Sequence, residues 1–297
     1  MKKKLRALMT AFIMSFAMAD YAMSAPIEIV VPTPPGGAID ITARGLSKAM
    51  SERGYDNIVT YHPGANGDIA LNLVNEKKNN TILVASSANF VFSNIVLNRD
   101  NVYARDTVLL GPVATNPLAF IVATNSQYKN VSELIQDARR RPVSCAASNS
   151  HGEIELRLIN QTYGTQFEPI LYKGTGQLIP DVVGGHVPCA YDQVAPFSAL
   201  EGKIRFLATS QPYRKDIPTV GSVLSKYSFV TWYGAAIPKG SNLLQDGKLV
   251  EIVSSWTQNT EAAKPLVDKS FGIPKPDTNL NARALKETVA YRNLKKN

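Results

Sequence analysis

The stretch best suited to binding chemistry lies around Gly36 and Gly37. Before these glycines, Ile27 to Val31 is a short apolar, β-branched run, which predicts a buried strand. Prolines then end the strand, and the two glycines permit a tight turn with exposed backbone N–H groups. From Ile39 to Met50, apolar residues recur every three or four positions, as on one face of a helix. A helix start of this kind has unpaired N–H groups and a partial positive charge, so it suits a carboxylate or a phosphate.

The same stretch also allows a purely structural interpretation, in which it is the first strand-to-helix turn of an α/β domain. Asp40 falls in the first turn of the predicted helix, where a carboxylate complements the helix dipole. This capping role is favoured over direct contact between Asp40 and a ligand.

Similar turns follow the next strands of the first half. The predicted strand Asn57–His62 ends in the glycine-rich turn Pro63–Gly67, and the strand Thr81–Ala85 ends in the polar turn Ser86–Asn89. Ligands of α/β sheets lie at the carboxyl ends of the strands, which is where all these turns fall.

The pattern restarts in the second half. Polar turns begin at Ser148 and Lys173, and Asp192 ends a third strand. The strands that precede them are predicted at Val143–Ala147, Phe167–Tyr172 and Val187–Tyr191. The turn after the first of them is expected to run from Ser148 to Gly152, and the helix from Glu153 to Tyr163.

The alternation of strands and helices predicts two βαβαβ units, each with a largely parallel sheet, and therefore an α/β fold of two lobes with a ligand cleft between them. Lobe one is expected to comprise residues 26–120 and 233–297, and lobe two residues 121–232.

Residues 1–25 are excluded from this fold, because a basic start and the apolar run from Ala7 to Ala19 are typical of an export signal. Cleavage is expected near Ser24 or Ala25, and the mature chain should be periplasmic without membrane insertion. The signal carries four Lys/Arg and one Asp, so its removal lowers the net charge from +8 to +5. The cations are dispersed, which argues against nucleic-acid binding.

No catalytic or metal site is expected. Ser150 and His151 could be imagined in a nucleophile triad, but the chain has no G-x-S-x-G elbow around them. His62, His151 and His186 are too scattered for a zinc site. We therefore expect a binding protein without cofactor.

Six short motifs together resemble the solute-binding receptors of tripartite tricarboxylate transporters, the Bug family. These motifs are Pro35–Asp40 with Ala43 and Arg44, Pro63–Gly67, Tyr172–Gly174, Asp181–Gly185, Lys203–Thr209 and Trp232–Gly234. The resemblance implies a periplasmic two-lobed Venus flytrap of the type II-like periplasmic-binding-protein fold. It also implies a monomer that binds a small carboxylate and delivers it to membrane permease subunits.

The resemblance implies which residues hold the ligand: one carboxylate at the two lobe-one loops and the distal end at lobe two. The expected site consists of Pro35, Gly36, Gly37, Ala38, Gly64, Ala65, Asn66, Gly67, Ser86, Ser87, Asn89, Ser148, Asn149, Ser150, His151, Gly152, Lys173, Gly174 and Asp192. Asp192 is expected to orient a loop or to bind an ammonium group.

The chain departs from the family pattern at several positions. His62 stands where the family has Arg, and Asn66 replaces the second glycine of that loop. Glu153 lies where the family continues with Thr or Ser. Its carboxylate is interpreted as a charge at a helix start; if it faced the cleft instead, it would favour a ligand with an amine.

Cys145 and Cys189 form an isolated pair in a chain expected in an oxidising compartment. In the implied topology they lie on adjacent parallel strands of lobe two, which predicts a disulfide. Two alternative functions stay open: a sensor subunit with the same pocket, and an enzyme on the same scaffold.

Overall fold

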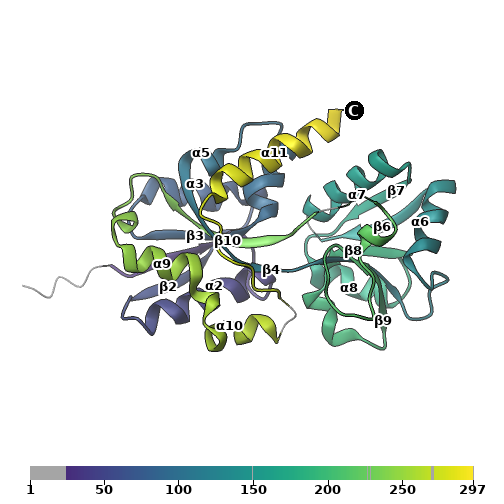
Figure 1. The fold of residues 1–297 in the computed structure, drawn as a ribbon, viewed down its shortest axis with the longest axis horizontal. Helices are drawn as coiled ribbons and strands as arrows, with labels where there is room; N and C mark the ends of the chain where they lie inside the picture. Colours follow the sequence, from purple (N-terminus) through teal and green to yellow (C-terminus); the bar gives the residue numbers. More distant parts are fainter. Residues whose placement is uncertain (1–24, 149, 226, 228, 269–270, 297) are drawn as a thin grey trace, which may run out of the picture.

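The computed structural model describes residues 25–148, 150–225, 227, 229–268 and 271–296. These residues form two five-stranded sheets that lie side by side, each with helices on both faces (Figure 1). We call the first sheet with its helices lobe one and the second sheet with its helices lobe two. The export signal expected at residues 1–25 lies outside the described residues, apart from Ala25.

In the sheet of lobe one, three strands run parallel to one another, and a fourth runs antiparallel to both of its neighbours. Its strands, in spatial order, are β2 (Asn57–Tyr61), β1 (Ile27–Val31), β3 (Thr81–Ser86), β10 (Trp232–Pro238) and β4 (Thr107–Thr115). The carboxyl ends of β1, β2 and β3 meet at one edge because these strands are parallel, so the three sequence-predicted loops of this lobe are brought together.

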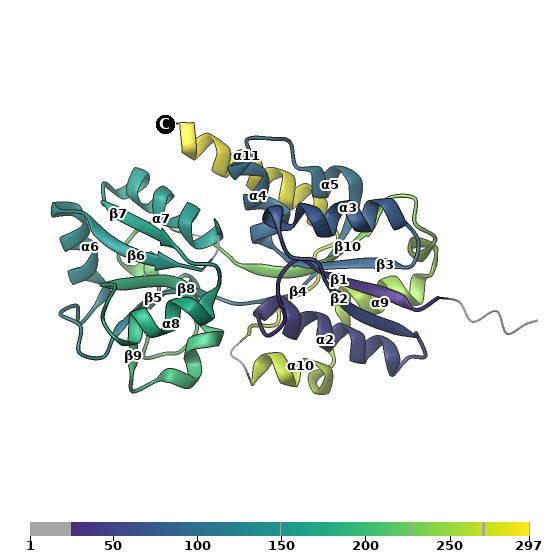
Figure 2. The same ribbon diagram turned by 180° about the vertical axis from the view of Figure 1, so that it is seen from behind.

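Two helical layers cover this sheet because alternate side chains of each strand face opposite sides. One layer consists of α2 (Ala38–Ser51), η5 (Asn242–Gln245), α9 (Gly247–Ser255), η6 (Trp256–Gln258) and α10 (Thr260–Val267). The other consists of η1 (Ala65–Gly67), α3 (Asp68–Lys77), η2 (Ala88–Phe92), α4 (Ser93–Val96), α5 (Val102–Asp106) and α11 (Leu280–Lys296). Figure 2 shows both layers from behind.

The sheet of lobe two has the same spatial pattern of three parallel strands, then an antiparallel strand and an edge strand. Its strands are β7 (Phe167–Leu171), β6 (Val143–Ala147), β8 (Cys189–Gln193), β5 (Leu118–Ala123) and β9 (Ile204–Thr209). Its helices are α6 (Val131–Arg140), α7 (Ser150–Tyr163), α8 (Thr175–Val183), η3 (Ala195–Leu200) and η4 (Val220–Ser222). The carboxyl ends of β6, β7 and β8 again meet at one edge.

The chain passes between the lobes through two connections. Asn116 and Pro117, which we call the hinge link, join β4 to β5, and residues 210–231 join β9 to β10. β5 begins at Leu118 and lies wholly in the second sheet, so the boundary expected after residue 120 falls inside a strand. β10 begins at Trp232, which lies in the first sheet rather than at the end of lobe two.

Cys145 and Cys189 are direct register partners on the parallel strands β6 and β8. Their Cα atoms are 4.7 Å apart and the two residues form a disulfide, which confirms the predicted pairing. The first helix of lobe two, α7, begins at Ser150 rather than at the predicted Glu153.

Candidate functional site

The first loop of lobe one is held by a buried carboxylate. Asp40, which is 5% exposed, accepts a hydrogen bond of 2.8 Å from the backbone N–H of Gly36 through Oδ2. Gly36 has φ of +96°, in the left-handed region that favours glycine. Pro35, Gly36 and Gly37 remain exposed, and Ala38 opens α2. The carboxylate therefore fixes the turn while the turn itself stays open to solvent.

Two further side chains donate hydrogen bonds to the second oxygen of Asp40. Oδ1 accepts from Arg44 Nε at 2.8 Å and from the hydroxyl of Tyr61 at 2.6 Å. Burial and the hydrogen bond to Asp40 raise the pKa of Tyr61. Because both oxygens of Asp40 accept hydrogen bonds within the protein, an anion at this loop would not face an unpaired carboxylate.

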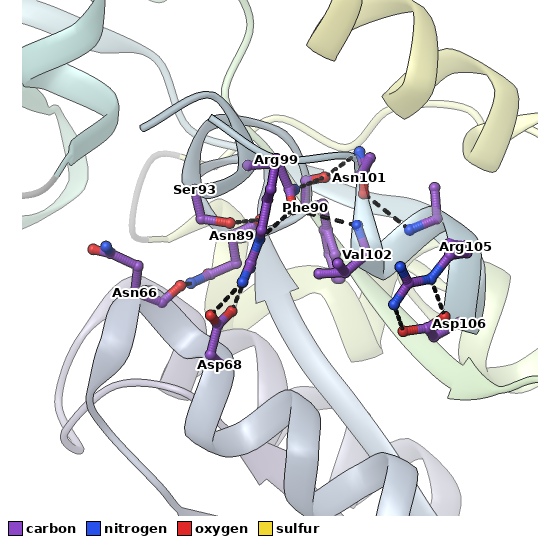
Figure 3. A network of polar contacts seen from close by, with 12 residues as sticks. Asn66, Asp68, Asn89, Phe90, Ser93, Arg99, Asn101, Val102, Arg105 and Asp106 are labelled. Carbon is purple, nitrogen blue, oxygen red and sulfur yellow. Dashed lines mark hydrogen bonds and ion pairs between the residues drawn. The ribbon is translucent and has the colours of Figure 1, made fainter. Parts of the chain in front are cut away.

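The second loop of lobe one depends on Asn89. Its Nδ2 donates to the carbonyl of Asn66 at 3.1 Å (Figure 3). Its Oδ1 accepts from the N–H of Ser86 at 3.4 Å. Gly64, Ala65 and Asn66 are exposed, whereas Gly67 is buried. A Cβ on Gly67 would lie 2.6 Å from Asn89 Nδ2, so only glycine fits there.

The polar residues Ser86, Ser87 and Asn89 are themselves buried. Asn89 supports the second loop, whereas the hydroxyl of Ser87 accepts a hydrogen bond from the N–H of Trp232 at 3.4 Å. Below them, Asp68 at the start of α3 forms a two-pronged ion pair with Arg99, with distances of 2.6 and 2.5 Å (Figure 3). This ion pair connects α3, the helix after the second loop, to the segment around Arg99, which lies after the third loop, Ser86–Asn89.

The side chain of His62 contacts two polar side chains of the lobe-one sheet. Its Nε2 lies 3.6 Å from Glu28 Oε1 and 3.2 Å from Thr60 Oγ1. Glu28 also forms an ion pair with Lys77. His62 is thus part of a polar cluster on the strands β1 and β2.

In lobe two, Asp192 organises the loop after β6. Its Oδ2 accepts from the N–H of Ser148 at 3.0 Å, and its Oδ1 accepts from the N–H of Gln193 at 2.6 Å. Asp192 is fully buried, and this burial raises its pKa to about 6. Both oxygens accept hydrogen bonds from the backbone, so Asp192 holds the loop after β6 in this structure.

The next turn of lobe two joins the same cluster. Thr175 Oγ1 donates to Ser148 Oγ at 3.0 Å, and Gly174 precedes α8 with φ of +148°. Lys173, beside it, is exposed and supplies a cation at the edge of the lobe. Thr175 directly follows the motif Tyr172–Gly174, and nothing local predicts its contact with Ser148.

The residues from Ser150 to Gly152 do not form the expected loop, because they make the first turn of α7. His151 is 1% exposed and stacks on Phe92 of lobe one, with ring centroids 4.2 Å apart. A Cβ on Gly152 would lie 2.7 Å from the carbonyl oxygen of Tyr191, so this glycine is required by packing. Asn149 lies outside the described residues.

Two acidic residues of α7 have separate partners. Glu153 accepts from Arg157 at 3.1 and 2.9 Å, one helical turn away. Glu155 is fully buried, with its Oε1 2.5 Å from His151 Nε2. Its Oε2 accepts from the hydroxyls of Tyr191 and Tyr227, each at 2.6 Å. Glu153 therefore does not present an unpaired charge, and Glu155 is part of the core.

The described ranges contain no cluster of three or more residues of the types that bind metals. Among the same ranges, no helix combines the length and apolar character needed to cross a bilayer.

Comparison with known proteins places this arrangement in a family. The model of the "Tripartite tricarboxylate transporter family receptor" matches residues 42–294. A curated relative, a UPF0065 protein of Pseudomonas sp. strain P51, is 29% identical over 271 residues, which cover 84% of this chain and 78% of the relative.

Solved structures share the fold at lower identity. An R. palustris protein with adipate has a TM-score of 0.76 at 20% identity, over 91% of this chain and 96% of the other. MatC from Rhodopseudomonas palustris with bound malate has a TM-score of 0.75 at 20% identity, over 91% of this chain and 98% of the other. These likenesses confirm the two-lobed α/β fold of periplasmic binding proteins. The chain therefore belongs to the tripartite tricarboxylate transporter receptor family, whose members are solute-binding receptors and not enzymes.

Proposed function

We propose that this chain is a periplasmic receptor that captures a small carboxylate between its lobes and delivers it to membrane permease subunits of a tripartite transporter. The observation that carries the proposal is the exposed turn at Gly36 and Gly37, held at a helix start by the buried Asp40. Backbone N–H groups at a helix start suit a carboxylate.

The chemistry of lobe two supports a ligand with a second polar or anionic end. Lys173 is exposed there, while Glu153 and Asp192 are both occupied by partners within the protein. The structural neighbours solved with malate and adipate hold dicarboxylates. We therefore place dicarboxylates first in the proposed substrate class, ahead of amino acids and aromatic acids.

A thermal-shift screen of carboxylates tests the binding step. A ligand at 100 times its Kd stabilises the folded state by about 2.7 kcal/mol, so a true ligand gives a clear shift. If no small carboxylate shifts the melting temperature, the receptor proposal fails.

Gly37→Leu locates the site. A Cβ at Gly37 meets nothing within 4 Å and its φ is −87°, so the fold should tolerate the larger side chain. We expect unchanged stability and loss of the ligand-induced shift. Gly247→Leu is the matched control, since this exposed glycine also has open space around it at the start of another helix. Equal ligand shifts in both variants would exclude the first loop from the site.

Delivery to a permease needs a separate test. Cells that lack this chain should take up the radiolabelled carboxylate found in the screen more slowly than cells that contain it. Unchanged uptake would contradict the transport role and favour the alternative of a sensor subunit.

A further inference from the structure

Three aromatic rings form a column that crosses from lobe one to lobe two. Phe92, the last residue of η2 in lobe one, stacks on His151 of α7 in lobe two, with ring centroids 4.2 Å apart. Phe92 also stacks on Tyr291 of α11, with centroids 5.1 Å apart. We call these three residues the inter-lobe column. Since Phe92 is 2% and His151 is 1% exposed, the contact between the lobes excludes water.

The lobe-two end of the column is held in place by a buried polar cluster. His151 Nε2 lies 2.5 Å from Glu155 Oε1 on the same helix. The other oxygen of Glu155 accepts hydrogen bonds of 2.6 Å from the hydroxyls of Tyr191 and Tyr227. The ring of His151 therefore moves with lobe two as a rigid part of its core.

The other end of the column is fixed to lobe one through α11, which extends from lobe one toward α7 (Figures 1 and 2). Asn101 Nδ2 donates to Thr288 Oγ1 at 2.9 Å, and Asn281 Oδ1 accepts from the N–H of Leu109 at 2.8 Å. These contacts lie on both sides of one helical turn of Tyr291 or further along α11. Tyr291 and Phe92 therefore move together with lobe one.

The column lies beside the two connections between the lobes. The N–H of Asn116 in the hinge link donates to the carbonyl of Thr231 in the second connection at 3.2 Å, so the two connections meet there. Thr231 Oγ1 in turn lies 3.4 Å from His151 Nδ1. When two lobes turn about a hinge, displacement grows with distance from the axis. A contact beside the connections therefore moves least and persists while more distant loops approach each other.

The column is also close in sequence to the loops proposed to hold the ligand. Phe92 comes three residues after Asn89, and His151 comes three residues after Ser148. We propose that the inter-lobe column is the pivot on which the lobes turn during carboxylate capture, and that Phe92 and His151 are positioning residues for the loops that meet the ligand. This proposal rests on the proposed function, because capture needs the lobes to close in a defined orientation.

Two leucine substitutions on η2 separate this role from a general role in stability. Phe92→Leu removes the ring at the centre of the column. Phe90→Leu is the matched control, because Phe90 is equally buried on the same short helix but stacks on Trp232 within lobe one, with centroids 5.3 Å apart. Tyr291→Leu is an independent variant at a half-buried position of the column. Urea unfolding checks that every variant is folded.

The orientation of the lobes is measured without ligand, by pulsed electron spin resonance on the mature chain. Spin labels are placed at Lys48→Cys on α2 and Gln177→Cys on α8, which are exposed positions on lobe one and lobe two. Both native cysteines are in the disulfide, so only the introduced thiols react. We expect Phe92→Leu and Tyr291→Leu to broaden the distribution of label distances, and Phe90→Leu to leave it as in the wild type. Equal distributions in Phe92→Leu and Phe90→Leu would overturn the proposal.

Binding of the carboxylate found in the thermal-shift screen gives a second measurement. A receptor that samples orientations unable to bind has a higher apparent Kd. Loss of one aromatic pair should raise the Kd of Phe92→Leu about two- to tenfold over that of Phe90→Leu. Equal Kd values would contradict the positioning role. If no carboxylate binds the wild type, the proposed function fails, while the label distances still decide whether the column controls the orientation of the lobes.

NMR of ¹³C-labelled histidine distinguishes a pivot from a contact that breaks on closure. The chain has only three histidines, so His62→Gln and His186→Gln assign the ring signals of His151. The ring of Phe92 should displace these signals upfield, and the displacement should persist when the carboxylate saturates the receptor. Loss of the displacement on saturation would show that the stack opens, and would overturn the pivot.

Discussion

The backbone N–H of Gly36 donates a 2.8 Å hydrogen bond to the carboxylate of Asp40, four residues along the chain. The same carboxylate accepts from Arg44, one turn further along α2, and from Tyr61 at the end of β2. A single buried side chain thus connects the proposed ligand loop, the helix after it and the neighbouring strand. Asp40 is a positioning residue for this loop.

Asp40→Asn tests this role. The amide nitrogen of Asn cannot accept a hydrogen bond, so at least one of the three partners is left unpaired. Hydrogen bonds to charged groups contribute about 1.5–3 kcal/mol, and we expect the free energy of unfolding in urea to fall by about that amount. Calorimetry should also show weaker binding of any carboxylate identified by the screen.

Asp56→Asn is the control for this change, because Asp56 is an exposed carboxylate on the same lobe. A surface substitution of this kind usually changes stability by less than about 0.5 kcal/mol. Equal stability of the two variants would contradict the role of Asp40.

Local sequence patterns were enough to predict the strand β1, the glycine turn and the helix after it. The position of Asp40 in the first helical turn was predicted in the same way and is confirmed. The contact with Tyr61 could not be predicted locally, because it depends on the parallel pairing of β1 with β2.

The polar residues after β6 show the opposite case. The polar residues from Ser148 to Gly152 predict a turn between the strand Val143–Ala147 and a helix that begins at Glu153. In the structure, Ser150 and His151 belong to the first turn of helix α7. His151 is buried by Phe92, which comes from the other lobe, and no local signal indicates such a contact.

Gly67→Ala should disrupt the second loop. Gly67 has φ of +97°, and an added Cβ would lie 2.6 Å from Asn89 Nδ2 and 2.8 Å from the hydroxyl of Tyr103. Backbone strain of this kind costs about 1–3 kcal/mol, and we expect a corresponding loss in the free energy of unfolding. Gly37→Ala is the matched control, since it has neither strain nor a close neighbour. A Gly67→Ala variant as stable as Gly37→Ala would contradict this account.

The disulfide between Cys145 and Cys189 closes a loop with a sequence separation of 44. Replacement of both cysteines by alanine should lower the free energy of unfolding by about 2–4 kcal/mol, chiefly because the unfolded chain is less constrained. Thiol titration of the denatured protein should count no free thiols without reductant and two after reduction. Two thiols without reductant would show that the bond is not formed.

Asp192 should make stability depend on pH in a direction opposite to that of most carboxylates. Burial raises its pKa to about 6 in the folded state, whereas an unfolded aspartate titrates near 3.9. Between these values the folded state binds the proton more tightly, so this contribution is complete below about pH 4 and is lost as the pH rises through 6. The difference amounts to about 2–3 kcal/mol.

Urea unfolding of the wild type and of Asp192→Asn at pH 4 and pH 7 measures this contribution. Asparagine stays neutral, so the variant lacks the proton-linked component while all other titrating groups are shared. The wild type should therefore lose stability relative to the variant between pH 4 and pH 7. A constant difference between the two proteins would show that Asp192 titrates alike in the folded and unfolded states. In that case burial would not control the protonation of the Asp192 carboxylate, which accepts the hydrogen bond from the N–H of Ser148.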